Sequence, residues 1–129
     1  MKISRIAGAL LLSLTAAGAQ AVPLSTLLGG GSITANDRLF DNWSLVSYSA
    51  SDATRSFDAA NIDVTALTDG GDKPGPGLNF SVSNAELSVT GDGIYAFIDL
   101  MFGFRVSTLD PLSRIGDNSL AYAGGAAYW

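Results

Sequence analysis

The sequence predicts an all-β fold, an antiparallel β-sandwich of the jelly-roll or immunoglobulin type that is incomplete at the C-terminus. Three features indicate this class. Apolar side chains alternate with other residues through residues 94–106, which is the two-residue period of a strand. Shorter alternating runs recur along the chain, with glycine, proline, asparagine and aspartate between them. No segment of the expected domain sustains the period of a helix.

The first residues have the composition of an export signal. Lys2 and Arg5 are basic, a short apolar run follows, and small residues stand at Ala19 and Ala21. This order predicts a secretory signal peptide over residues 1–21, with Ala19 and Ala21 at the cleavage site. The apolar run is shorter than the roughly 20 residues of a transmembrane helix. We therefore expect export, and no integral membrane segment in the mature chain.

The expected mature chain is acidic and has no cysteine. The full chain has a formal net charge of −5, which becomes −7 when Lys2 and Arg5 are removed. An acidic surface gains nothing from counterion release, so we expect no nucleic-acid partner. Without cysteine no disulfide framework is available, and the apolar core has to hold the fold.

The mature N-terminus is predicted to be an apolar arm and glycine hinge over residues 22–31, followed by one sandwich domain over residues 32–129. Three consecutive glycines at 29–31 favour the hinge, and we expect the leucines before them to dock on the domain. A short strand is expected at 32–35. Asn36 and Asp37 then form a turn that accepts left-handed backbone angles.

Two further strands are expected in the first half of the domain. Residues 39–49 have large apolar groups on both parities, for example Phe40 and Trp43, which predicts a strand with a bulge near Asp41 and Asn42. Residues 61–67 alternate cleanly and predict a half-buried antiparallel strand.

The second half contains the long alternating run. After a glycine- and proline-rich loop at 68–77, alternation resumes at Leu78 and changes phase after Ser83. Residues 85–89 are predicted to pair with residues 94–106 through a tight hairpin, with the even positions of the latter run buried. Asp99 and Arg105 lie too far apart along that strand to pair with each other, so each is expected to meet a cross-strand neighbour or solvent. Two short strands are expected beyond it, over residues 112–115 and 120–123.

Several of these segments resemble a known family. Residues 32–43 resemble the G-D-K-x-F-x-N-F/W opening of exported bacterial proteins of the PEP-CTERM class, which exosortase systems sort to the cell surface. Residues 61–64, 77–80 and 99–106 resemble, in the same order, the N-I-x-V, G-L-x-F and D-L-x-I-x-Y-x-V segments of that class.

The resemblance covers residues 24–127 and implies a surface or matrix-associated protein of a Gram-negative bacterium. It supplies no catalytic residues. The Val-Pro-Glu-Pro motif, membrane helix, basic tail and final strands of the class are not found before Trp129. We therefore expect an incomplete sandwich, in which the strand at 94–106 has no neighbour on one edge or no covering layer.

The residue inventory predicts a protein that is not an enzyme. With neither histidine nor cysteine in the chain, a Ser-His-Asp triad, a Cys-His pair and a zinc site with nitrogen or sulfur ligands are excluded. Glu86 is the only glutamate, and together with Asp99 it is the only carboxylate pair that we consider for hydrolysis. We expect no catalytic, cofactor-binding or metal-binding residues.

Two interpretations of the surface remain open. The Gly-Asp clusters at 69–72, 91–93 and 116–118 are either simple turns or calcium-binding loops. Trp43 and Tyr95 either pack in the core or stack on a sugar ring. The sequence thus predicts a structural or binding role at the cell surface or in the extracellular matrix, with a polysaccharide or cell-surface partner. The alternative is a carbohydrate- or calcium-dependent binding module, with its site on the loops at 68–77 and 91–93.

Overall fold

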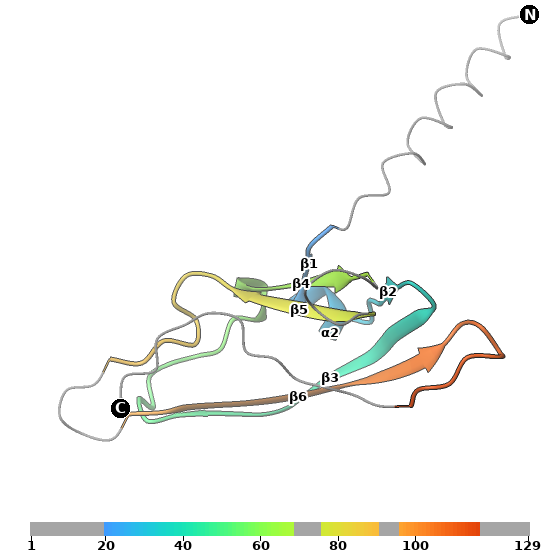
Figure 1. Ribbon diagram of the computed structural model, residues 1–129. Helices are drawn as coiled ribbons and strands as arrows, with labels where there is room; N and C mark the ends of the chain where they lie inside the picture. Colours follow the sequence, from blue (N-terminus) through green and yellow to red (C-terminus); the bar gives the residue numbers. More distant parts are fainter. Residues whose placement is uncertain (1–19, 69–75, 91–95, 117–129) are drawn as a thin grey trace, which may run out of the picture.

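The protein consists mostly of strands in two antiparallel sheets, which confirms the predicted all-β class (Figure 1). The computed structural model describes residues 20–68, 76–90 and 96–116. The elements are β1 (Val22–Pro23), α2 (Leu24–Leu28), β2 (Ile33–Ala35), β3 (Arg38–Ala50), the 3-10 turn η2 (Ala59–Asn61), β4 (Ile62–Leu67), β5 (Gly77–Val82) and β6 (Ile98–Thr108). One sheet has the order β1-β4-β5 and the other has the order β2-β3-β6. Within these residues, no helix has the length and apolar character needed to cross a membrane.

Strand β6 contains residues 98–106 of the long alternating run. Its even positions Ile98, Leu100, Phe102 and Val106 are half-buried, and the last three pack against the core. The predicted parity is therefore confirmed, but burial of this face is partial, since Phe104 is 38% exposed. The strand also begins later than expected, at Ile98.

The predicted hairpin partner of this strand is wrong. β6 pairs along its whole length with β3, whereas residues 85–89 form no strand. Asn84 and Ala85 both have a φ of 54°, and the Glu86 and Ser88 amides donate to the carbonyls of Ser83 and Ala85 at 3.1 and 3.0 Å. Left-handed residues followed by local turns cannot continue a ladder.

The predicted strand at 112–115 is also absent. The Ser113 amide donates to the Asp110 carbonyl at 3.1 Å, and Leu112 is 91% exposed. A local turn therefore takes the place of cross-strand pairing. The candidate at 120–123 lies outside the described residues.

A bulge in β3 explains why both parities of that strand are apolar. The register with β6 shifts between Asp41 and Ser44, and Asn42 has a φ of 55°, which confirms the predicted bulge. The extra residue brings Phe40 and Trp43 to the same buried face, where each is 6% exposed. A second shift, between Leu45 and Ser47, leaves the intervening valine outside the paired register.

The N-terminal segment belongs to the core. β1 pairs with β4, and Leu24 and Leu27 of α2 are both 0% exposed, so the expected docking of the leucines is confirmed. The glycines at 29–31 end the helix: the Gly31 amide donates to the Thr26 carbonyl at 3.2 Å, and a Cβ on Gly31 would lie 2.9 Å from that oxygen. Their role is this tight turn against the helix.

The two sheets contact each other through aromatic rings and through α2. Between the sheets, the ring of Phe80 in β5 lies 6.3 Å from that of Trp43 in β3 and 5.4 Å from that of Phe102 in β6, centre to centre. Within the β2-β3-β6 sheet, the Trp43 and Phe104 rings are 4.5 Å apart. Figure 1 shows the β4–β5 layer lying over the β3–β6 pair, with α2 between them. The buried core consists of Leu24, Leu27, Ile33, Ala35, Phe40, Trp43, Ile62 and Val64. Burial of Ile62 and Val64 confirms the half-buried strand predicted at 61–67.

Candidate functional site

A shallow pocket of about 200 Å³ lies where the end of β3 meets the residues before β6. Its polar lining is Ser51, Asp52, Arg55 and Thr90, and its apolar lining includes Val89 and Phe97. Ser51 joins the two walls, because its amide donates to the Phe97 carbonyl at 3.0 Å and its Oγ accepts from the Phe97 amide at 3.0 Å. The pocket is thus held together by hydrogen bonds between Ser51 and the backbone of Phe97, which are far apart in sequence.

Arg55 holds the turn that replaces the predicted strand at 85–89. Its Nη1 donates to the Ser88 carbonyl at 2.6 Å, and its Nη2 donates to the carbonyls of Ala85 and Glu86 at 2.9 and 2.7 Å. The planar guanidinium fork suits several acceptors in fixed positions. Arg55 therefore acts as a clamp on the backbone of this turn.

Asp52, beside Arg55, is held in its ionised form. Hydrogen bonds from the side chain and then the amide of Thr54, at 2.6 and 3.0 Å, lower the pKa of the Asp52 carboxyl, and the charge of Arg55 adds to the effect. A general acid needs a raised pKa in order to hold its proton at neutral pH. Asp52 is consequently a turn-capping carboxylate and an unsuitable proton donor.

Glu86 has both carboxylate oxygens engaged. It is 8% exposed; its Oε1 accepts from the Asp58 amide and its Oε2 from the Asn61 Nδ2, both at 2.8 Å. Asp99 instead lies exposed on β6, opposite Ser49, and no hydrogen bond within the described residues joins it to Glu86. Glu86 thus fastens the turn to the loop before β4, and the geometry gives it a structural role.

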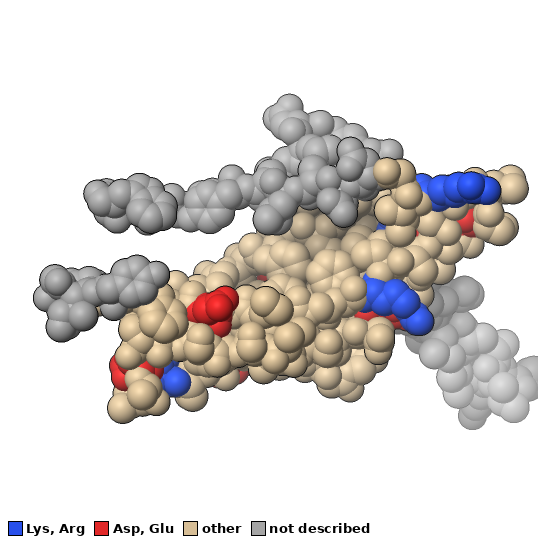
Figure 2. Space-filling view, turned by 90° about the horizontal axis from the view of Figure 1, so that it is seen from below, with Lys and Arg blue, Asp and Glu red and all other residues tan. Residues whose placement is uncertain are grey.

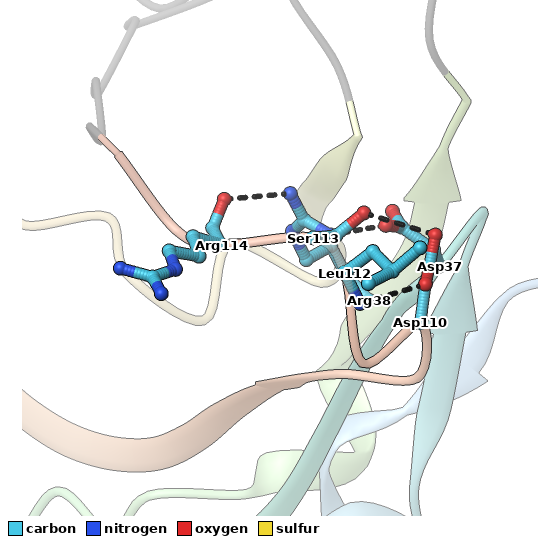
Figure 3. A network of polar contacts seen from close by, with 6 residues as sticks. All are labelled: Asp37, Arg38, Asp110, Leu112, Ser113 and Arg114. Atoms are coloured by element: carbon cyan, nitrogen blue, oxygen red, sulfur yellow. Dashed lines mark hydrogen bonds and ion pairs between the residues drawn. The ribbon is translucent and has the colours of Figure 1, made fainter.

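The polar contacts around Asp37 form a second structural network (Figure 3). A hydrogen bond from Ser113, followed by the hydrogen bond and charge of Arg38, lowers the pKa of the Asp37 carboxyl. The Arg38 Nη2 also donates to the Arg114 carbonyl at 3.3 Å, and the Leu109 amide donates to the Asp37 carbonyl at 2.7 Å. These bonds hold the chain that follows β6 against the turn between β2 and β3.

The face of the β3–β6 pair that points away from β4 and β5 is polar. Its cross-strand pairs are Asp41 with Arg105, Ser44 with Gly103, Ser47 with Met101, and Ser49 with Asp99. The Nε and Nη2 of Arg105 donate to the two carboxylate oxygens of Asp41 at 2.9 and 2.8 Å, which lowers the pKa of Asp41 and raises that of Arg105. The expected cross-strand partner of Arg105 is therefore confirmed. Figure 2, seen from below, shows a mostly uncharged surface with isolated charged groups.

The opposite face of the pair is apolar and covered unevenly. We use "open side" for Leu45, Phe80, Val82 and Phe104, which are 46%, 37%, 45% and 38% exposed. They belong to the inner faces, because the register sets Leu45 beside Phe102 and sets Phe80 and Val82 beside buried residues of β4. Three of the four are on β5 and β6, the last strands in the order of their sheets.

The structure places only part of the predicted site residues. Ala21 is exposed and directly precedes β1, whereas Ala19 lies outside the described residues. Tyr95 and all or part of each Gly-Asp cluster also lie outside them. Trp43 is buried and donates from Nε1 to the Phe40 carbonyl at 3.2 Å, which confirms its core interpretation. Within the described part of the chain, no three acidic side chains gather as metal ligands.

Sequence reasoning missed Arg55, because a single arginine in a polar, irregular stretch has no pattern that separates a clamp from a solvated side chain. Comparison of the chain with protein-family models, with curated proteins and with solved structures gives no match. The resemblance of the sequence to the PEP-CTERM class therefore stays a prediction.

Proposed function

We propose that this chain is an exported, non-enzymatic protein of the cell surface or extracellular matrix of a Gram-negative bacterium, with a structural or binding role. The observation that carries the proposal is the open side, whose large apolar side chains stay more than a third exposed, and three of which lie on β5 and β6, the last strands of their sheets among the described residues. A sheet edge next to an apolar face is a favourable place for another polypeptide to add.

The charged groups near the pocket support the same conclusion. Arg55 and Glu86 bond to the loop and turn that they hold together, and Asp52 caps its own turn. Each of these groups has a structural reason for its position. The export part of the proposal is supported by the leader-like composition of residues 1–21.

Fractionation of a Gram-negative host that expresses the full chain tests the location. We expect the protein outside the cytoplasm with an N-terminus at Val22, and we expect an Ala21→Arg variant to keep its leader. Intact protein in the cytoplasm would overturn the proposal.

A glycan array, read with and without calcium, then distinguishes the two binding hypotheses. Silence on all sugars supports a structural role based on protein contacts. Calcium-dependent binding to a sugar would instead establish the carbohydrate-binding module.

A further inference from the structure

We infer that β6 pairs with β6 of a second copy of this chain, in an antiparallel register centred on Phe102. Within the described residues, β6 is hydrogen-bonded to β3 on one side and is the last strand in its sheet. Its other edge therefore offers a row of backbone donors and acceptors over Ile98–Thr108. Such an edge satisfies these groups by adding a strand.

The charge pattern of β6 is self-complementary. Asp99 and Arg105 are its only charged residues, and each is three positions from Phe102. In the proposed register, Asp99 of one copy lies opposite Arg105 of the other, and the reverse pair forms by symmetry. Charged side chains on an edge strand discourage pairing when like charges meet, whereas opposite charges directly across a ladder stabilise it.

The geometry of the exposed charges suits this pairing. The Arg105 side chain is 64% exposed although it bonds Asp41 through Nε and Nη2, which leaves Nη1 as a donor without a bond among the described residues. Asp99 is exposed on the same face of the sheet. Arg105 would then lie between Asp41 of its own copy and Asp99 of the second copy. β6 itself has no net charge. Repulsion between the two negatively charged copies therefore comes from residues outside the paired strands.

The apolar positions match in the same register. Ile98 lies opposite Val106, Leu100 opposite Phe104, and Phe102 opposite itself, all on the inner face. Each of these side chains is only partly buried in one copy. Pairing would extend the apolar face across the two-fold axis and cover the half-exposed Phe104.

A two-fold axis at Phe102 closes the assembly at two copies. The outer edge of β6 in each copy is paired in this contact. The result is one continuous sheet with the order β2-β3-β6-β6-β3-β2, to which no third copy can add through β6. In an antiparallel ladder, two residues directly opposite each other form either a hydrogen-bonded or a non-hydrogen-bonded pair. A two-fold axis between the two copies of Phe102 is compatible with both kinds of pair.

This inference adds to the proposed function by naming a second copy of the chain as the partner in the structural role, and it rests on the proposed function in that respect only. Cytoplasmic retention would overturn the proposed function and leave the pairing intact. A purified protein that stays monomeric would overturn the pairing alone.

Sedimentation of the purified protein over a dilution series, together with a charge swap, tests the register. We expect a dimer for the parent chain. Asp99→Arg sets arginine against arginine and should raise the dissociation constant about tenfold or more. The double variant Asp99→Arg, Arg105→Asp restores opposite charges across the axis and should recover dimerisation; it is made with Asp41→Asn, so that residue 105 does not face a like charge in its own copy. Asp63→Arg makes the same charge change on β4, which is paired on both sides, and should leave the dimer unchanged.

Cross-linking provides a second readout that does not depend on charge. The chain has no cysteine, so a single introduced thiol is a clean probe. In the proposed register, the two copies of residue 101 lie about 8 Å apart, whereas those of residue 109 lie about 40 Å or more apart. Met101 and Leu109 are similarly exposed, at 53% and 55%. A short bismaleimide should link Met101→Cys into dimers and leave Leu109→Cys unlinked.

Three outcomes would overturn the inference. The first is a monomer at every concentration, as would follow if another part of the chain occupies the β6 edge. The second is a dimer that Asp63→Arg weakens as much as Asp99→Arg does. The third is equal cross-linking at residues 101 and 109. Circular dichroism of each variant shows whether a lost dimer reflects a lost fold.

Discussion

The two sides of the core have the same kind of residues and very different burial. On the side filled by α2, Leu24, Leu27 and Val64 are 0% exposed, whereas Leu45 and Val82 on the open side are 46% and 45% exposed. All of them are aliphatic side chains in regular elements on inward faces. The difference teaches that alternation decides which face is apolar, while burial depends on whether another element covers that face.

Substitution of one leucine on each side should give the largest contrast. Leu27→Ala removes a fully buried side chain and should lower the free energy of unfolding by about 2–5 kcal/mol. Leu45→Ala removes a half-exposed side chain of the same type and should cost under about 1.5 kcal/mol. Urea denaturation of both variants measures the difference. Equal losses would mean that Leu45 is covered in solution.

The Arg55 clamp is expected to have the next largest effect. Arg55→Met removes hydrogen bonds to three carbonyls of the turn after β5 and should lower the free energy of unfolding by about 1–3 kcal/mol. Hydrogen exchange should rise at Ala85–Ser88 before it rises in α2. Arg55→Lys is the matched control, because it keeps the charge and loses the fork. Full stability of the lysine variant would show that charge alone holds the turn.

The bulge that brings Trp43 to the buried face of β3 should be sensitive to the residue at its left-handed position. Asn42 has a φ of 55°, a conformation that costs most non-glycine residues about 1–2 kcal/mol and costs asparagine less. Asn42→Ala should therefore destabilise the protein by about 1 kcal/mol, and Asn42→Gly should be close to neutral. Thermal unfolding of the two variants checks this order, and a more stable alanine variant would contradict it.

The smallest expected effect concerns pH and the polar outer face. The hydrogen bonds and charge of Arg105 lower the pKa of Asp41 below its usual 3.8. The pKa of Asp41 is lower in the folded than in the unfolded protein. The ion pair therefore stabilises the fold at a pH above the unfolded-state pKa, and this stabilisation is lost as the pH falls through the folded-state pKa. Asp41→Asn should therefore flatten the acid side of the stability profile, below about pH 4. The unfolding midpoint measured against pH tests this, and an unchanged profile in the variant would contradict it.

Much of the local structure could be predicted from spacing alone. The parity of β6, the half-buried β4 and the bulge at Asn42 in β3 follow from which positions are apolar, because a strand alternates its faces at every residue. These features depend only on residues close together in the sequence. Spacing left Trp43 open between the core and a sugar-binding surface, and the structure places it in the core.

The wrong prediction at residues 85–89 has a physical cause outside that segment. Residues 85–89 alternate like a strand, yet Arg55 and Glu86 join this segment to a loop about thirty positions earlier through hydrogen bonds at 2.6–2.9 Å. Local spacing has no information on a partner so distant. The leucines of residues 22–31 could be expected to dock on the domain, but only the tertiary contacts of α2 with β3 and β4 show where they do so.

The sequence by itself determined the all-β class and the face on which each strand is apolar, because both depend on a short-range period. The tertiary structure alone decided which strands pair, which side of the core α2 closes and which strands are last in their sheets among the described residues. Every strand offers the same backbone donors and acceptors, so pairing cannot be chosen from local pattern. Strand pairing depends instead on how the apolar faces pack together in space and on the long-range hydrogen bonds of Arg55 and Glu86.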